Sequence, residues 1–295
     1  MFKQFVLFSA LFILISSSSL ILNKFSAKPK NDFRKLLHRC EINNKACYEA
    51  YEIFKGACNE RNIKGCVYLG YLYFRGLGVE RDYKKSAEYF KMACDKGDPK
   101  GCNNLGLLYQ YGLGVELNHQ KTAELYAEAC KSGYVKGCNN LGTLYMHGLG
   151  VEVDYKKAFK LFKIAYENGD IRGLTNLGYL YEKGLGVKQD YQKAYELYKL
   201  ACDKKDIRAC TNLGYLYMKG NIKNFKKAYK LSKFTCEKGD PLGCTNLGWL
   251  YENGLGVEMD YKKAYELYKK ACKMGDLLGC ENYQILRVVQ HSREF

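Results

Sequence analysis

Apolar positions recur along the chain with the period of an α-helix. In the segment GCNNLGLLYQYG, Cys102, Leu105, Gly106 and Tyr109 fall at i, i+3, i+4 and i+7, which is one face of a helix. Glycines end this segment and open a loop, and a second amphipathic segment then begins at an Asp or Asn. No segment shows the two-residue alternation of a strand. The pattern predicts an all-α chain built from helix pairs.

The same helix pair returns at a nearly constant interval. The residue that ends each second helix recurs every 36 residues (94 − 58, 130 − 94), with one interval of 34 (236 − 202). The short interval arises where the loop GLGVKQDY at 184–191 becomes GNIKNF at 220–225. A fixed period of this size predicts a solenoid of stacked supersecondary units. The marker positions are Cys58, Cys94, Cys130, Tyr166, Cys202, Cys236 and Cys272.

The repeated text resembles a known family. NLGYLYEKGLGVKQDYQKAYELYKLAC is similar to the Sel-1-like repeat, a relative of the tetratricopeptide repeat, and the cysteine spacing resembles the Helicobacter cysteine-rich proteins. The resemblance implies a right-handed α/α superhelical solenoid whose first helices line a concave face. We expect a signal peptide over 1–27, an N-terminal helical cap over 28–60, six repeats over 61–274 and a capping helix over 275–295.

The first residues are typical of an export signal. Lys3 precedes an apolar run from Phe5 to Ile15, and small residues follow at Ser16–Ser19 and Ser26–Ala27. An uncleaved anchor is the alternative, because no charge lies between Gln4 and Asn23. Lysines on the translocated side argue against the anchor. The sequence therefore predicts a secreted or periplasmic protein in an oxidising compartment.

The 14 cysteines favour disulfides over metal ligands or nucleophiles. Zinc ligands are usually closer in sequence, and the four histidines follow no repeat, so we expect neither a metal nor a cofactor. A glycine before the second cysteine lets two helix ends approach closely. The fourth joint, AYENGDIRGL, loses both cysteines together, as a bonded pair would. The expected pairs are Cys58–Cys66, Cys94–Cys102, Cys130–Cys138, Cys202–Cys210, Cys236–Cys244, Cys272–Cys280 and, in the N-terminal cap, Cys40–Cys47.

Three rows of residues on the first helices are candidates for a ligand-binding groove. In similar tetratricopeptide proteins the amide position lines the groove, where Asn can bind a peptide backbone. Alternatively, each Asn bonds the backbone of the neighbouring repeat, and the cations form a solvated face. The amides are Asn104, Asn140, Asn176, Asn212 and Asn246. The cations are Lys64, Lys100, Lys136, Arg172 and Arg208, and the third row is Tyr71, Leu107, Thr143, Tyr179, Tyr215 and Trp249.

Three classes of function follow from these features. The first is an exported monomeric scaffold that binds an extracytoplasmic protein, an extended peptide or a cell-wall fragment. The resemblance also implies a β-lactamase acting on penicillin and cephalosporin derivatives, although the chain has no Ser-x-x-Lys and no zinc-hydrolase cluster. Its formal charge of +16 suggests nucleic acid, but export, disulfides and the packing positions of the aromatic residues argue against that partner.

Overall fold

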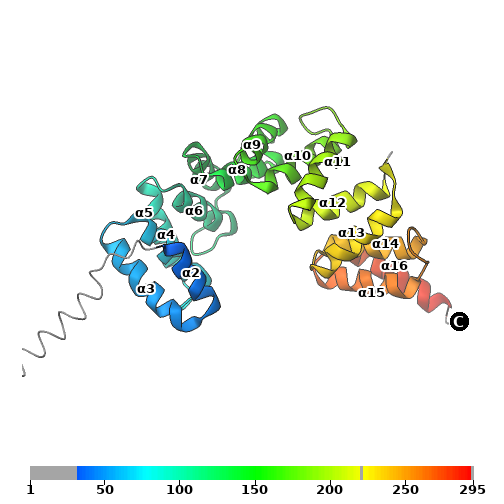
Figure 1. The fold of residues 1–295 in the computed structure, drawn as a ribbon, viewed down its shortest axis with the longest axis horizontal. Helices are drawn as coiled ribbons and strands as arrows, with labels where there is room; N and C mark the ends of the chain where they lie inside the picture. Colours follow the sequence, from blue (N-terminus) through cyan, green and yellow to red (C-terminus); the bar gives the residue numbers. More distant parts are fainter. Residues whose placement is uncertain (1–31, 220–221, 294–295) are drawn as a thin grey trace, which may run out of the picture. The chain divides into compact units, whose positions relative to one another are not determined.

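The computed structural model describes residues 32–219 and 222–293 (Figure 1). The predicted signal peptide lies outside the described residues. Within them the chain forms 15 helices and no strand, which confirms the predicted all-α solenoid of helix pairs. In this part of the chain, no helix has both the length and the apolar character needed to cross a membrane.

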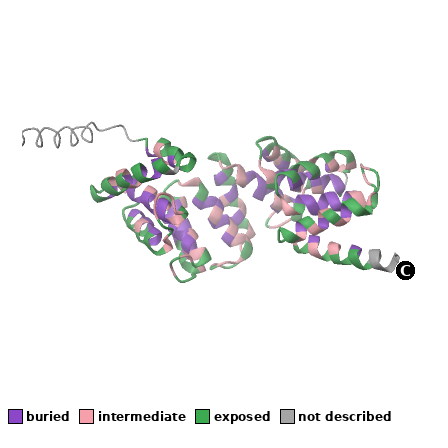
Figure 2. Ribbon diagram, turned by 90° about the horizontal axis from the view of Figure 1, so that it is seen from below, coloured by how far each residue is buried: buried purple, intermediate pink, exposed green. Residues whose placement is uncertain are grey.

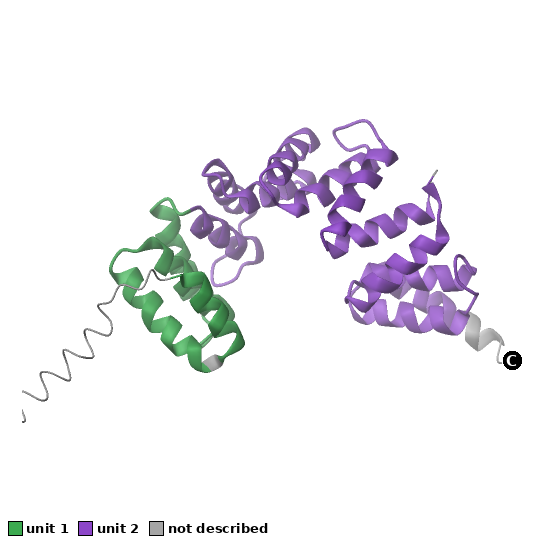
Figure 3. Cartoon of the chain, viewed as in Figure 1, with its two compact units in different colours: residues 1–98 green, residues 99–295 purple. Residues whose placement is uncertain are grey.

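The helices fall into two compact units, residues 1–98 and residues 99–295 (Figure 3). In each unit, successive helices pack against each other. Unit 1 contains α2(Phe33–Ile42), α3(Asn44–Asn59), α4(Ile63–Arg75) and α5(Tyr83–Asp95). Unit 2 contains α6(Pro99–Tyr111), α7(His119–Lys131), α8(Val135–His147), α9(Tyr155–Glu167), α10(Ile171–Lys183), α11(Tyr191–Asp203), α12(Ile207–Met218), α13(Phe225–Glu237), α14(Pro241–Asn253), α15(Tyr261–Lys273) and α16(Leu277–Arg293).

Side-chain caps and left-handed glycines set the helix boundaries. The Asp190 side chain accepts a hydrogen bond from the Lys193 amide at the start of α11, and Gly184 ends α10 with φ of 68°. The fifth repeat differs at its loop, because α12 ends at Lys219 in an extended conformation instead of at a left-handed glycine. The shortened loop therefore begins with a different helix end. Equivalent caps are Asp82, Asn118, Asp154, Asn224 and Asp260.

In five of the six repeats, the core is an aromatic side chain of the second helix packed against a glycine of the first. Buried residues line the faces where helices meet (Figure 2). A Cβ on Gly178 would lie 2.6 Å from the Tyr198 ring, so this close approach requires glycine. The corresponding ring is absent in the fifth repeat, where Ser232 replaces it. There a Cβ on Gly214 would have its nearest neighbour at 3.4 Å.

These two glycines provide a matched test of the packing. Gly178→Ala is expected to lower the free energy of unfolding by about 1–3 kcal/mol, because the added methyl overlaps the buried Tyr198 ring. Gly214→Ala is expected to be neutral or to stabilise by about 0.5–1 kcal/mol, since alanine is the better helix former and has room. Urea denaturation of both variants measures the difference. Equal losses would show that the ring does not determine the requirement for glycine.

Disulfide bonds join the end of one helix to the next helix. Their Cα–Cα distances are 4.4–4.7 Å, and none of the described cysteines is free. Cys94 and Cys102 are disulfide-bonded as well. The other bonds are Cys40–Cys47, Cys58–Cys66, Cys130–Cys138, Cys202–Cys210, Cys236–Cys244 and Cys272–Cys280, which are pairs that the sequence predicts.

The fourth joint keeps the turn without the sulfurs. The Gly169 amide donates to the Tyr166 carbonyl over 2.9 Å, as the Gly133 amide does to the Cys130 carbonyl. Leu174 is 1% exposed and takes the buried sulfur position, whereas Tyr166 is 39% exposed. A buried leucine therefore replaces a covalent link at this joint.

Candidate functional site

The first helices of unit 2 carry most of the predicted groove residues. α6 contacts α8, α12 contacts α14, and α14 contacts α16, so these first helices lie beside one another. A hollow of about 370 Å³ opens on α6, α8, α10 and α12. It brings together six of the predicted residues: Leu107, Asn140, Thr143, Arg172, Asn176 and Arg208. The rest of its lining is Gln110, Tyr111, Tyr126, Asn139 and Asp206.

The other groove candidates lie outside this hollow. Tyr71 belongs to unit 1, where its hydroxyl donates to Glu41 and the Arg75 guanidinium lies 5.9 Å from its ring centre. Trp249 is 37% exposed on α14. A larger hollow, of about 750 Å³, lies over the loop before α11 and extends to Ile222, beside residues outside the described ranges. The remaining candidates are on α4, α6, α8, α10, α12 and α14: Lys64, Lys100, Asn104, Lys136, Tyr179, Asn212, Tyr215 and Asn246.

The amide row links neighbouring repeats through side chains. Nδ2 of Asn140 donates to Oδ1 of Asn103 over 2.9 Å, and Nδ2 of Asn176 donates to Oδ1 of Asn139 over 2.9 Å. Nη2 of Arg208 donates to Oδ1 of Asn176 over 2.9 Å. Two of the amides therefore bond to the neighbouring repeat, but to a side chain and not to the backbone that the alternative expected.

Whether this link forms depends on a residue of the preceding repeat, the one directly before the amide position there. Sequence reasoning missed the role of this residue. Asn103 and Asn139 accept the bond, but the equivalent residues further along are Thr175, Thr211 and Thr245. The Thr211 hydroxyl donates to Asp240 over 2.8 Å instead. Asn246 follows in the next repeat, and its Nδ2 has no acceptor among the described residues. The change from Asn to Thr can be read from the sequence when the repeats are compared.

One cation of the groove, Arg172, forms an ion pair with an adjacent acid. Nη2 of Arg172 lies 2.6 Å from Oδ2 of Asp170, and this hydrogen bond raises the pKa of Arg172. Arg208 is exposed beside Asp206, which also lines the hollow. Lys64 and Lys136 are exposed on their first helices, as a solvated face would have them. The hollow therefore presents two guanidinium groups, with amides between them, to a polar ligand.

A stack of lysines and tyrosines continues the groove beyond the hollow. Nζ of Lys183 lies 5.8 Å from the Tyr179 ring centre and 5.7 Å from that of Tyr215, and Nζ of Lys219 lies 4.9 Å from the Tyr215 ring centre. Burial lowers the pKa of Lys183, but its hydrogen bond and charge interaction with Glu182 outweigh this effect and raise it. These lysines fall 11 residues after Arg172 and Arg208 (183 − 172, 219 − 208), a spacing that sequence reasoning overlooked. Lys183 ends α10, and Lys219 directly follows α12.

Buried tyrosines behind the groove have acceptors on the first helix of the same repeat. The Tyr126 hydroxyl donates to Gln110 over 2.7 Å, and the Tyr198 hydroxyl donates to Glu182 over 2.9 Å. Burial raises the pKa of Tyr126 and of Tyr198, which makes both hydroxyls poorer nucleophiles. These pairs therefore serve packing and position the groove residues.

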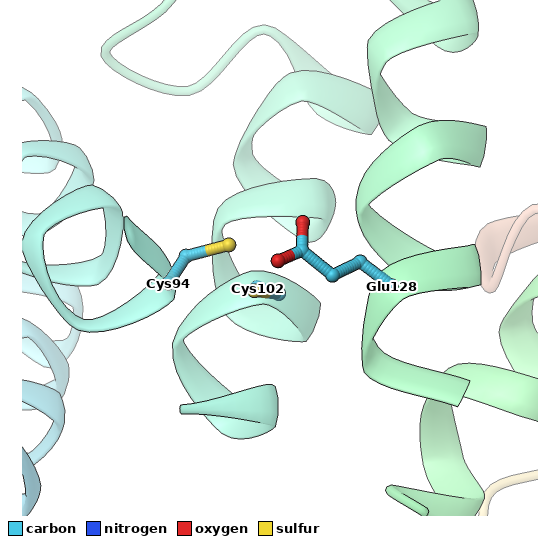
Figure 4. A group of neighbouring side chains, drawn as sticks. All are labelled: Cys94, Cys102 and Glu128. Atoms are coloured by element: carbon cyan, nitrogen blue, oxygen red, sulfur yellow. The ribbon is translucent and has the colours of Figure 1, made fainter. Parts of the chain in front are cut away.

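Figure 4 draws residue types that metal sites use: Cys94, Cys102 and Glu128. Cys94 and Cys102 are both in disulfide bonds. A thiolate binds metal ions, whereas a disulfide sulfur carries no negative charge to do so. We therefore assign no metal site to these residues.

The six helix pairs match a known repeat family. The model of the Sel1 repeat matches residues 63–98, 99–134, 135–170, 171–206, 207–240 and 241–276. The chain belongs to the Sel1 repeat family. The predicted resemblance to Sel1-like repeats is thereby confirmed.

Solved Sel1 repeat structures resemble this chain. A Sel1 repeat protein from Oxalobacter formigenes is 26% identical, with a TM-score of 0.74, covering 82% of this chain and 97% of that one. A protective antigen of uropathogenic Escherichia coli strains is 28% identical, with a TM-score of 0.63, covering 81% of this chain and 60% of that one. Cysteine-rich protein B of Helicobacter pylori is 29% identical, with a TM-score of 0.36, covering 45% of this chain and 96% of that one. None of the curated proteins compared with the chain matches it.

Membership in the Sel1 repeat family places the chain among helical scaffolds that generally mediate protein interactions. Its disulfide bonds indicate an extracytoplasmic location. The β-lactamase expectation finds no support in the matched family.

Proposed function

We propose that this Sel1 repeat protein is an exported monomeric scaffold that binds an extended segment of a partner protein along its first helices. The observation that carries the proposal is the hollow where Asn140, Arg172, Asn176 and Arg208 meet. Guanidinium groups bind carboxylates through paired hydrogen bonds, and amides bind peptide backbone. The two arginines therefore favour a peptide that carries acidic side chains over a neutral cell-wall fragment.

Export by the N-terminal signal is part of the same proposal, and the disulfides of both units support it. We propose the division predicted from the sequence: a signal peptide over 1–27, a cap over 28–60, six repeats over 61–274 and a capping helix over 275–295. The intact mass of protein recovered outside the cytoplasm tests it. A mass that still includes residues 1–27 would contradict cleavage.

A peptide selection tests the binding function. Dodecapeptides selected from a random display library against the oxidised full-length protein are expected to contain Asp or Glu. Their affinity is expected to fall at least tenfold in the double variant Arg172→Gln/Arg208→Gln, because each neutral amide keeps donors but loses the charge-assisted bond. Fluorescence anisotropy measures this loss.

The matched control removes the same charge elsewhere. Lys160 and Lys199 are exposed on the second helices α9 and α11, so Lys160→Gln/Lys199→Gln is expected to leave peptide affinity within about twofold. Equal losses of peptide affinity in the two double variants would show that the arginines act only through the net charge of the protein. Failure to select any peptide, together with binding of soluble peptidoglycan fragments, would overturn the proposed function.

A further inference from the structure

In the last helices of unit 2, the groove rows change from cationic and tyrosine side chains to apolar ones. The cation positions of the earlier repeats, of which Arg172 and Arg208 are the last, become Leu242 and Leu278. The aromatic position occupied by Tyr179 and Tyr215 becomes Trp249 and then Ile285. We call Leu242, Trp249, Leu278 and Ile285 the terminal apolar surface. These four side chains are 37%, 37%, 48% and 59% exposed.

The four residues share one side of two adjacent helices. Leu242 and Trp249 are seven residues apart on α14, and Leu278 and Ile285 are seven apart on α16, in the same register of the repeat. α14 contacts α16, and the Thr245 hydroxyl on α14 donates to Asp276, which precedes α16. Terminal repeats of a solenoid usually present polar residues to solvent. Large exposed apolar side chains at this end are therefore typical of a binding surface.

A second observation at the same place indicates a ligand. Asn246 lies between Leu242 and Trp249 in the sequence of α14 and is 5% exposed, and its Nδ2 has no acceptor among the described residues. Asn140 and Asn176 have acceptors at the equivalent position. A buried amide donor without an acceptor costs about 1–3 kcal/mol, so such groups usually have a partner. A peptide carbonyl would provide one.

We propose that the terminal apolar surface binds a large apolar side chain of the same peptide whose acidic residues contact Arg172 and Arg208, with Asn246 donating to a peptide carbonyl beside it. This inference rests on the proposed function. Charge complementarity determines which end of the peptide carries the acidic residues and which carries the apolar one. The cation rows end at Arg208 and Lys219, and the terminal apolar surface begins at Leu242. Asn246 is covered by its neighbours, so its side chain must turn toward the peptide on binding, as interface rotamers commonly do.

The peptide selection also tests this inference. Peptides selected on the unaltered protein are expected to carry Trp, Phe, Leu or Ile at one end and Asp or Glu toward the other. The triple variant Leu242→Arg/Trp249→Tyr/Leu278→Arg installs the residue types of the earlier repeats, which should preserve the fold. We expect those peptides to bind this variant at least tenfold more weakly, because their apolar side chain is no longer buried on binding. A new selection on it should keep the acidic residues and lose the apolar end.

Two outcomes separate this inference from the proposed function. Acidic peptides without an apolar end, selected on the unaltered protein, would overturn the inference and leave the proposed function standing. Selection of no peptide would overturn both. Asn246→Ala provides a further check: it should weaken peptide binding without lowering thermal stability, because it removes an amide donor that has no acceptor in the free protein. Unchanged affinity would remove Asn246 from the site.

Discussion

Replacing both cysteines of the Cys202–Cys210 pair with alanine is expected to lower the free energy of unfolding by about 2–3 kcal/mol. The bond closes a nine-residue loop (202–210) whose Cα atoms are 4.7 Å apart, so its loss returns conformational freedom to the unfolded chain. This loss is large for a repeat that packs only on its neighbours. Urea denaturation at neutral pH should show a lower midpoint with an unchanged slope.

The fourth joint supplies the control for this prediction. Tyr166→Ala changes an exposed side chain at the sulfur-free joint, so we expect a change within about 0.5 kcal/mol. Hydrogen exchange gives an independent measurement: amides of 166–174 should exchange faster than those of 202–210 in the oxidised protein. Reduction should remove that difference. Slower exchange at 166–174 than at every other joint would contradict the role assigned to the disulfides.

Repetition explains why so much of this fold could be predicted from the sequence. Helix starts at Asp190 and its equivalents depend on local hydrogen bonds, and a local rule can be checked six times in one chain. Disulfide pairing is also local, because each joint is a short turn. At the fourth joint, Tyr166 and Leu174 replace both cysteines at once, which indicates that the cysteines at these two positions pair with each other in the other repeats.

The candidate site was less predictable because its contacts join different repeats. Asn176 and Asn246 occupy the same position, yet one amide has an acceptor and the other has none. The difference depends on whether the preceding repeat supplies Asn139 or Thr211, a residue 37 or 35 positions earlier (176 − 139, 246 − 211). Side-chain partners at that distance follow from the offset between stacked helices, which a single repeat does not reveal.

Tyr198→Phe is expected to lower the free energy of unfolding by about 2–3 kcal/mol. Tyr198 is fully buried, and its hydroxyl donates to the carboxylate of Glu182, which is 5% exposed. The Asn212 side chain also hydrogen-bonds to this hydroxyl. Phenylalanine would leave a buried carboxylate and an amide without this partner, and hydrogen bonds to charged groups are the stronger ones. Urea denaturation measures the loss.

Tyr126→Phe is the matched control, because Tyr126 occupies the same position in the second repeat. Its acceptor is the neutral amide oxygen of Gln110, which is half-buried, so the expected loss is only about 0.5–1.5 kcal/mol. An equal loss in the two variants would show that the charge and burial of Glu182 add nothing. A reduced loss for Tyr198→Phe in a Glu182→Gln background would support the charged acceptor.

Alkaline pH should narrow the difference between the unaltered protein and Tyr198→Phe. Burial is the main cause that raises the pKa of Tyr198, followed by the negative charge of Glu182. The folded protein therefore keeps this proton at pH values above 10, where an unfolded tyrosine releases it. The stabilisation is fully present below pH 10 and is lost as the pH rises further. The other tyrosines are common to both proteins, so their titration cancels in the comparison. A difference that stays constant from pH 8 to about pH 11 would contradict the buried, protonated hydroxyl.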